Sequence, residues 1–209
     1  MITAVTLDNI DRYHDLYIQH FQLRQREFID RQEYDVFTHD GMEFDRYDSP
    51  SAVYLIHTLD GKQVLGASRL TKTVHGCMLA DLWPSLVDDK SLLQGADIWE
   101  GTRFCIDSAL PPDLRKRVCR EIACAYVEYA SDHNVKMIIG MMPTFILRSV
   151  FERSGIKLDR LGNVQAIPGF PKVQAAGIPI NQAQLSSVKA TSNVSNVLFR
   201  EETPRRLAA

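Results

Sequence analysis

Two short stretches of the sequence combine acidic, basic and aromatic residues at spacings that suit a binding or catalytic site. The first, "GMEFDRYDSP", holds three carboxylates, Glu43, Asp45 and Asp48, each separated by an aromatic residue or an arginine. A run of charge is usually a solvated loop. Such a loop has no need of Phe44 and Tyr47 among its acids. The stretch therefore raises the question of which positive groups it faces in the folded chain.

The second stretch, "WEGTRFCID", places a glutamate and an arginine three positions apart, at Glu100 and Arg103. In a regular strand, an odd separation puts two side chains on opposite faces. Gly101 lies between them, and an isolated glycine in a strand often marks a β-bulge. A bulge at Gly101 would bring Glu100 and Arg103 onto one face. The alternative is a surface ion pair, which contributes little to stability.

The first half of the chain must position both stretches. Helical spacing of apolar residues predicts a helix over "LDNIDRYHDLYIQHFQLRQREFID", with Asp8 or Asn9 as its N-cap. Two apolar runs around Asp60-Gly61 predict a β-hairpin, because both turn residues tolerate positive φ. "GADIWEGTRFCID" then predicts a central strand. The acidic stretch lies between the helix and the hairpin.

The second half alternates helices and strands. A helix opens at Pro111 and Pro112, and "VKMIIGMM" predicts a buried strand. "TFILRSVFERSG" predicts a short helix with Thr144 as N-cap and Gly155 as C-cap. A late strand, "KVQAAGIPI", precedes a last helix over residues 181–189. This order predicts an α/β fold, a mixed sheet flanked by helices, and such sheets bind ligands at the carboxyl ends of their strands.

Composition excludes several classes of function. The formal net charge is -2, which gives no overall field favouring nucleic acid or an anionic membrane. No apolar run reaches the ~20 residues that span a bilayer, and the N-terminus lacks the pattern of a signal peptide. The four cysteines form no CxxC pair and the histidines show no ligand spacing, so we expect reduced thiols, no metal site and a cytoplasmic location. We expect one domain over residues 1–209, with a loose tail at about 200–209.

The charged and aromatic residues of the two stretches, together with others in the first half of the chain, follow the order of a family signature. The chain resembles the acyl-homoserine-lactone synthases, the LuxI-type autoinducer synthase family, over most of its length. The family signature is an Arg, a Phe four positions later, an aromatic residue, two Asp three apart, an Arg at the end of a hairpin, and Glu-x-Ser-Arg-Phe on the central strand. The matching residues are Arg24, Phe28, Tyr34, Asp45, Asp48, Arg69, Glu100, Arg103 and Phe104. Tyr34 replaces the usual Trp and Thr102 replaces the Ser. Glu43 lies outside the signature, and we expect it to be a surface acid.

The resemblance implies a fold like that of the GCN5-related N-acyltransferases, a twisted mixed sheet with a cleft between two splayed parallel strands. It also implies a reaction between S-adenosylmethionine and an acyl thioester. The α-amine of S-adenosylmethionine attacks the thioester to give an amide. The substrate carboxylate then displaces methylthioadenosine and closes a homoserine lactone, a quorum-sensing signal. S-adenosylmethionine is a substrate here, so no cofactor is expected, and the acyl donor is an acylated acyl carrier protein or an acyl-CoA.

The chemistry of S-adenosylmethionine accounts for the residue types in the signature. The substrate carries a sulfonium, an α-ammonium and a carboxylate, so its pocket needs both anions and a cation. We expect Asp45 and Asp48 to complement the positive groups and to hold Arg24, Arg69 or Arg103 in place. Phe28 and Tyr34 would wall the pocket, with aromatic faces suited to a sulfonium. Glu100 would accept the α-amine proton, and backbone N–H groups near Phe104 would stabilise the oxyanion.

The donor side has weaker sequence signals. We expect the acyl chain to lie between the splayed strands, near Met141, Met142, Thr144 and Phe145. Each of these is at least as typical of a plain core, and a helix N-cap is the simpler interpretation of Thr144. Basic residues at the mouth of the cleft would steer an acidic carrier protein. The candidates for this docking are Arg115, Lys116, Arg148 and Arg153, although each alone is more typical of a solvated helix face.

Two rival functions remain open at this stage. One is an N-acyltransferase of the same fold that acts on another amine with acyl-CoA. Its Gly-rich pyrophosphate loop is missing, because the chain has "DSALPPDLRKR" there. The other is a degenerate, non-catalytic binder of acyl carrier protein. Retention of Glu100 and Arg103 argues against that alternative.

Overall fold

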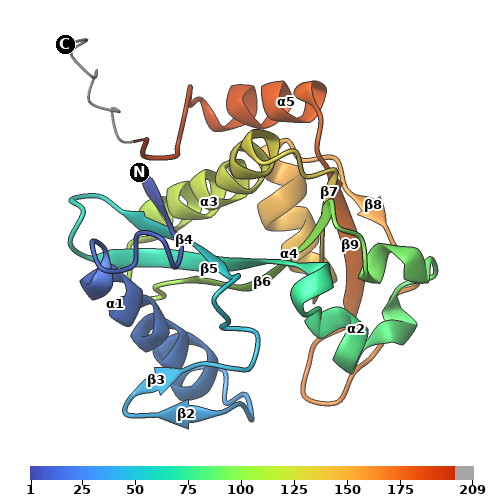
Figure 1. The fold of residues 1–209 in the computed structure, drawn as a ribbon, viewed down its shortest axis with the longest axis horizontal. Helices are drawn as coiled ribbons and strands as arrows, with labels where there is room; N and C mark the ends of the chain where they lie inside the picture. Colours follow the sequence, from blue (N-terminus) through green and yellow to red (C-terminus); the bar gives the residue numbers. More distant parts are fainter. Residues whose placement is uncertain (201–209) are drawn as a thin grey trace, which may run out of the picture.

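A computed structural model describes residues 1–200, and a seven-stranded sheet forms the centre of this described part (Figure 1). The order across the sheet is β1-β4-β5-β6-β7-β9-β8. Every neighbouring pair is antiparallel except β6 and β7, which are parallel. The strands are β1 Ile2–Val5, β4 Val53–Thr58, β5 Val64–Lys72, β6 Ile98–Ile106, β7 Met137–Pro143, β8 Asp159–Arg160 and β9 Val173–Pro179. The expected mixed sheet is confirmed, and the predicted tail falls outside the described residues except for Arg200.

The sheet divides between β6 and β7. These two strands pair only from Ile98 opposite Met137 to Glu100 opposite Ile139. Beyond that point β6 continues with β5, and β7 continues with β9. Figure 1 shows the consequence, with β5 and β6 running across the view and β7 and β9 running up it. The expected splay between two parallel strands is therefore confirmed.

One face of the sheet is covered by α3, Pro112–Asp132, and α5, Gln182–Ser192, packs against α3 (Figure 1). The predicted helix is present, and Val118, Ile122 and Tyr126 form an apolar stripe on α3 that is buried against the strands. α5 starts at the N-cap Asn181, whose side chain accepts a hydrogen bond from Gln184 N at 2.9 Å. This side holds the larger part of the core.

The other face carries α1, His14–Arg24, which continues as a π-helix, η1, over Gln25–Asp30. The predicted start at Asp8 or Asn9 is wrong. The Asn9 side chain instead accepts from Thr6 N at 2.8 Å and donates to Ala4 O at 3.0 Å, which fixes a turn. A small antiparallel ladder, β2 Thr38–His39 with β3 Met42–Glu43, leads into the acidic stretch.

The predicted hairpin is confirmed between β4 and β5. Gly61 has a φ of +76°, and Asp60 Oδ1 accepts from Lys62 N at 2.9 Å, which explains why both residue types stand at this turn. After β5 the chain forms short helices before it enters β6. These are η2 Thr73–His75, α2 Met78–Leu82, η3 Pro84–Leu86 and η4 Lys90–Leu93.

The predicted short helix after β7 is present but is irregular. It consists of α4 Thr144–Ile146, a π-helical turn η5 Leu147–Phe151 and a 3-10 turn η6 Glu152–Ser154. Gly155 ends it with a φ of +85°, the expected C-cap conformation. Thr144 is its first helical residue rather than the N-cap, which is Pro143.

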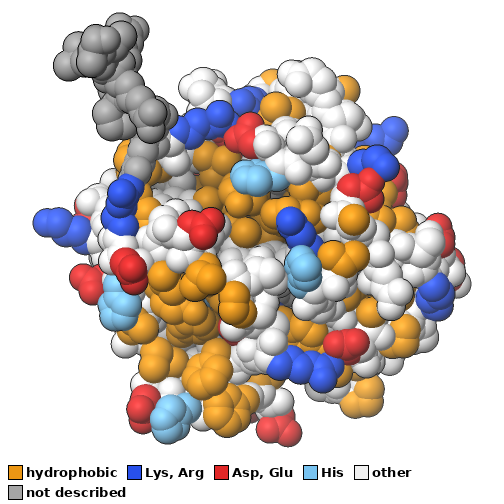
Figure 2. All heavy atoms as spheres, in the orientation of Figure 1, with side chains coloured by type: hydrophobic (Ala, Val, Ile, Leu, Met, Phe, Trp, Pro, Cys, Tyr) orange, Lys and Arg blue, Asp and Glu red, His pale blue; other side chains and the backbone are white. Residues whose placement is uncertain are grey.

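The charges on the surface and the state of the cysteines are the remaining features of the fold. On the face in Figure 2, basic and acidic side chains are interspersed and form no large patch of one sign. In the described part of the chain, Cys77, Cys105 and Cys124 are buried free thiols and Cys119 is half-buried. Residues 1–200 contain no cluster of His, Cys, Asp or Glu arranged to hold a metal ion, and no helix among them is long and apolar enough to cross a membrane.

Candidate active site

Arg24, the last residue of α1, is buried with 1% of its side chain exposed. Its Nε donates to Glu43 Oε2 at 2.5 Å, and its two terminal nitrogens donate to the two oxygens of Asp48 at 2.8 and 2.9 Å. Burial alone would raise the pKa of Asp48, but the hydrogen bonds and charge of Arg24 outweigh it and hold that pKa well below its ordinary value. Both groups are therefore fully charged at neutral pH.

Arg69, on β5, is the second buried arginine. It donates to both oxygens of Asp45, at 2.6 and 3.1 Å, and its Nη1 lies 2.8 Å from Asp48 Oδ1. Its Nε donates to Thr102 Oγ1 at 3.0 Å. Thr102 therefore presents to Arg69 the hydroxyl that a serine would present.

Arg103 is the third arginine, and Glu43 is its main partner. Its Nη2 lies 3.0 Å from Glu43 Oε1 and 2.8 Å from Asp45 Oδ2. Glu43 is 0% exposed and bridges Arg103 to Arg24, so the expectation that it is a surface acid is wrong. Its side chain enters the core because β3 turns it toward the sheet, whereas a run of charge on its own indicates a solvated loop.

The three arginines and three carboxylates form one ion network, hereafter the arginine–carboxylate network (Arg24, Arg69, Arg103, Glu43, Asp45 and Asp48). Its formal charges cancel, and every member has at least two polar contacts with another member. A buried ionic network is favourable only when its members are mutually paired in this way. Much of the negative charge of the acidic stretch is thus explained by the arginines that surround it.

A β-bulge in β6 directs Arg103 into this network. Thr102 lies opposite Arg69 and Cys105 lies opposite Ala67, so Ser68 faces two residues of β6, Arg103 and Phe104. Arg103 has a φ of +53°, the left-handed conformation typical of a bulged residue. The bulge therefore exists two positions later than the sequence predicts.

Gly101 has a different role from the predicted one. A Cβ at this position would lie 2.4 Å from Tyr126 Cε1, so glycine is required by close packing against α3. Similarly, a Cβ on Gly140 of β7 would lie 2.8 Å from the carbonyl oxygen of Gly101. The two glycines stand at the point where the strands start to separate.

Glu100 lies on the same face of β6 as Arg103 and is 2% exposed. Its two oxygens accept hydrogen bonds from Met78 N and Leu79 N, each at 2.7 Å, in the first turn of α2. Burial raises the pKa of Glu100 to about 7, and these backbone donors only partly oppose that shift. A glutamate with such a pKa can both accept and release a proton near neutral pH.

Glu100 and Arg103 open onto a cleft of about 660 Å³ between α1–η1, α2 and the splayed end of β7. This volume is typical of small-molecule sites. The cleft, hereafter the substrate cleft, brings together nine of the predicted site residues: Phe28, Tyr34, Glu100, Arg103, Phe104, Arg115, Met141, Met142 and Phe145. Arg24, Asp45, Asp48 and Arg69 do not line it. They lie behind Arg103, in the ion network that fixes its guanidinium.

Aromatic side chains form one side of the substrate cleft. Phe28 and Tyr34 are stacked with ring centroids 6.1 Å apart and an angle of 8° between the rings. The Arg103 guanidinium lies 5.8 Å from the Phe28 ring centroid. Burial raises the pKa of Tyr34, so its hydroxyl stays protonated. Tyr34 thus lies on the wall of the substrate cleft.

The other four predicted residues, Thr144, Lys116, Arg148 and Arg153, belong neither to the lining of the cleft nor to the arginine–carboxylate network. Thr144 donates its backbone N–H to Lys172 O at 3.0 Å at the start of α4. Lys116, Arg148 and Arg153 are exposed helix residues, and Lys116 pairs with Asp113 at 3.2 Å. Their expected roles stay predictions, and Arg115 alone of the four basic candidates reaches the cleft.

The cleft residues that the sequence interpretation missed include Met78, Trp83 and Phe170. Phe170 lies 5.1 Å from the Tyr34 ring and 5.8 Å from the Trp83 ring, so it joins two segments distant in the sequence. Trp83 and Phe170 stand beside prolines in irregular segments, where periodicity gives no signal. An aromatic residue in a Gly/Pro-rich loop is the one sign that could have indicated them.

The fold and the site together define a class of protein. A twisted mixed sheet that opens between two parallel strands is the architecture of the GCN5-related N-acyltransferases, and here a buried, protonatable glutamate faces the opening. The chain is an acyltransferase.

The chain belongs to the autoinducer synthase family, whose model matches residues 8–188. It is 29% identical over 168 residues to the isovaleryl-homoserine lactone synthase of Bradyrhizobium diazoefficiens, covering 78% of this chain and 72% of the relative. A CoA-dependent acyl-homoserine lactone synthase, solved with S-adenosylmethionine and isopentyl-CoA, is similar with a TM-score of 0.85 and 26% identity, covering 98% of this chain and 94% of that one. The acyl-homoserine-lactone synthase LasI is similar with a TM-score of 0.79 and 25% identity, covering 97% of this chain and 98% of that one.

Proposed function

We propose that the protein is an acyl-homoserine-lactone synthase that joins S-adenosylmethionine to an acyl thioester. The observation that carries this proposal is the placement of Glu100 and Arg103 on one face of β6, both lining the substrate cleft. The family and the relatives named above support the same reaction. Its products are an acyl-homoserine lactone, methylthioadenosine and the free thiol of the donor.

Glu100 is the proposed base for the first step. The α-amine of S-adenosylmethionine must lose a proton to attack the thioester carbon, and a free α-amino group titrates near pH ~8. Glu100, with a pKa of about 7, is well matched to this transfer, either directly or through one water. The amine nitrogen then forms the amide bond, and the thiolate of the donor leaves.

The tetrahedral intermediate of this step carries an oxyanion. Backbone N–H groups at the β6 bulge, beside Phe104, are the proposed donors to it. The bulge supports this role because the extra residue interrupts the regular pairing between β5 and β6 at Ser68. Phe104 itself packs against Tyr126 and Phe151 on the other side of the strand, which fixes the backbone there.

S-adenosylmethionine is proposed to bind between the aromatic wall and Arg103. The substrate carboxylate pairs with the Arg103 guanidinium, which is 17% exposed and is the network member that reaches the cleft. The Phe28 and Tyr34 rings suit the sulfonium. In the second step that carboxylate attacks the carbon next to the sulfonium, and the carbon–sulfur bond breaks to release methylthioadenosine.

The acyl chain is proposed to follow the splay between β6 and β7. Met141, Met142 and Phe145 line this part of the substrate cleft. Met142 and Gly101 also line a narrow apolar cavity of about 30 Å³, together with Tyr126, Phe151 and other core residues. Met142 therefore separates the open cleft from the deep cavity.

The donor is proposed to be an acyl-CoA or an acylated acyl carrier protein. The structural relative solved with S-adenosylmethionine and isopentyl-CoA supports the first. Arg115 at the cleft, with the exposed Lys116, Arg148 and Arg153, offers positive charge to either donor. Assays with matched acyl-CoA and acyl carrier protein substrates would decide between them.

Mass spectrometry of extracts from cells that express the protein tests the reaction and identifies the acyl chain. We expect an acyl-homoserine lactone that is absent when Glu100→Gln is expressed at the same level. Extracts without any such lactone, from cells that contain the folded protein and both substrates, would contradict the proposal. An N-acylated amine without the lactone ring would instead indicate an acyltransferase for another substrate.

A further inference from the structure

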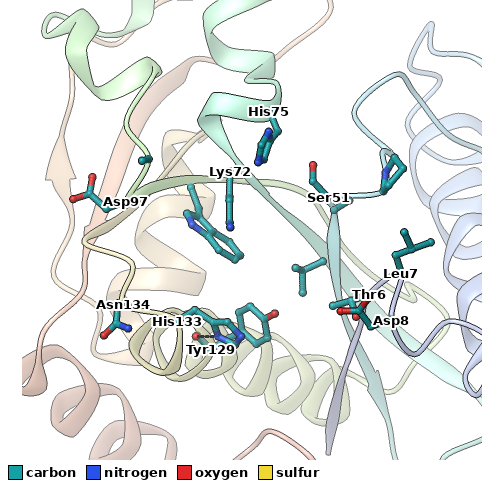
Figure 3. A pocket seen from close by; sticks show the side chains of 15 residues that line it. Thr6, Leu7, Asp8, Ser51, Lys72, His75, Asp97, Tyr129, His133 and Asn134 are labelled. Carbon is teal, nitrogen blue, oxygen red and sulfur yellow. Dashed lines mark hydrogen bonds between the residues drawn. The ribbon is translucent and has the colours of Figure 1, made fainter.

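A second cleft lies at the start of β6, on the side of the strand opposite to Glu100. It has a volume of about 640 Å³ and shares no lining residue with the substrate cleft. Its walls come from the loop after β1, the start of β4, the end of β5 and the end of α3 (Figure 3). None of the residues assigned to the acyl transfer reaction is among them.

Lys72 is the charged centre of this second cleft. It is the last residue of β5 and lies opposite Trp99 in the sheet, with its Nζ 5.7 Å from the Trp99 ring centroid. In Figure 3 the Lys72 side chain ends inside the cleft. Within residues 1–200 no carboxylate pairs with Lys72. The nearby Asp97 is instead neutralised by Lys136.

Aromatic rings form the floor. Tyr129 and His133, one turn apart on and after α3, stack with centroids 4.0 Å apart at 20°. Trp99 lies 6.0 Å from Tyr129 and 6.2 Å from His133. The backbone oxygen of Tyr129 lies 2.8 Å from His133 Nδ1 and holds the exposed imidazole in place. A ring of this kind offers a stacking surface to a planar base.

The remaining polar groups lie across the cleft. Asp8 and Thr6 lie across the cleft from Lys72, and His75 lies above Lys72 in the view of Figure 3. Asp8 repels an anion but accepts hydrogen bonds from hydroxyl groups, as acidic residues do from a ribose. The cleft thus has the Lys72 ammonium and the His75 imidazole on one side, aromatic rings at the bottom, and the Asp8 carboxylate as a hydrogen-bond acceptor on the other side.

We propose that this second cleft binds a nucleotide, with the phosphate at Lys72 and His75, the base against the exposed His133 ring, and the ribose hydroxyls toward Asp8. The volume is within the range of small-ligand sites. Because Trp99 precedes Glu100 on β6, the nucleotide would sit on the opposite face of the strand that carries the proposed base.

Isothermal titration calorimetry with adenosine 5′-monophosphate tests this proposal on the full chain. We expect binding with a Kd below ~1 mM, weakened about tenfold in Lys72→Gln because the phosphate loses a charged hydrogen bond. Lys62→Gln, an exposed lysine in the β4–β5 turn, makes the same change of charge and should bind like the wild type. Thermal unfolding of all three proteins checks that the variants are folded.

Two further titrations separate this cleft from the substrate cleft. Binding of the nucleotide should persist in the presence of saturating S-adenosylmethionine, and adenosine without phosphate should show no difference between the wild type and Lys72→Gln. Failure of the wild type to bind adenosine 5′-monophosphate, equal affinity in Lys72→Gln, or displacement by S-adenosylmethionine would each overturn the proposal. These outcomes do not depend on acyl transfer activity.

Discussion

Arg103 donates from its Nε to Glu43 Oε1 at 3.1 Å, although the two residues are 60 positions apart in the sequence. The contact joins the acidic stretch to the central strand in a place that water barely reaches. It also makes the orientation of the cleft-facing arginine dependent on a carboxylate outside the signature.

Glu43→Gln should therefore be costly. It leaves Arg24 and Arg103 with an uncompensated buried positive charge, which we expect to lower the free energy of unfolding by ~3–5 kcal/mol. Asp40→Asn, an exposed acid in the turn before β3, is the control and should change it by less than ~0.5 kcal/mol. Urea denaturation measures both values. A Glu43→Gln protein as stable as the control would contradict the network.

Glu100→Gln should nearly abolish lactone formation. Loss of a general base lowers the rate by ~10²–10⁴, while one amide oxygen still accepts a backbone N–H of α2. Glu152→Gln, at an exposed pair with Arg160, should keep full turnover. Steady-state kinetics on folded protein decide, and wild-type turnover in Glu100→Gln would remove the residue from the proposed chemistry.

The same residue should give stability a characteristic pH dependence. Its pKa is raised from 4.5 to about 7, so the native state binds this proton more tightly than the unfolded chain. The stabilisation is fully present below pH ~4.5 and is lost as the pH rises through ~7, in total roughly 3 kcal/mol. The free energy of unfolding of the wild type minus that of Glu100→Gln should therefore fall as the pH rises over that range. The other carboxylates titrate in both proteins and cancel in this difference. A difference independent of pH would mean that the pKa is not raised.

Tyr34→Ala should raise the KM for S-adenosylmethionine more than the KM for the acyl donor, because the ring stacks on Phe28 beside Arg103. Tyr34→Trp should be tolerated, since the cleft wall there is open enough to leave Tyr34 half-buried. Phe37→Ala, with an aromatic ring that is 61% exposed, serves as the control. Unchanged KM values in the alanine variant would place Tyr34 outside the site.

Met142→Ala should shift the preference toward longer acyl chains. The substitution joins the substrate cleft to the deep apolar cavity, and each further methylene group buried there should raise relative kcat/KM about fourfold. Met141→Ala is the matched control, because Met141 lines the cleft but not the cavity. Competition assays with a series of acyl donors compare the two. The same chain-length profile in both variants would argue against this path.

Much of the site could be predicted from the sequence, because charged residues at a characteristic spacing in the sequence also meet in the folded chain. Arg24, Asp48 and Arg69 were expected to meet, and they do. Glu43 was missed because its burial depends on β3, a two-residue strand that no periodicity indicates. Trp83 and Phe170 were missed for a similar reason, since tertiary packing rather than local pattern brings irregular segments to the cleft.

The fold was predictable where elements are long and periodic. The β4–β5 hairpin, α3 and α5 match their patterns, whereas the start of α1 does not. Asn9 has a side chain that caps helices and also closes turns, and only the contacts with Thr6 and Ala4 decide between the two. The short strand β1 escaped prediction because four residues are too few to show alternation.

The bulge in β6 also bears on how the site could have arisen. Thr102 and Cys105 face the α1 side and Gly101 and Phe104 face α3, an alternation that is the same with or without Arg103. Deleting this one residue would leave Phe104 opposite Ser68 and every later side chain on its present face. A single-codon insertion into a regular strand would therefore add an arginine to the cleft without disturbing the inside and outside of an existing sheet.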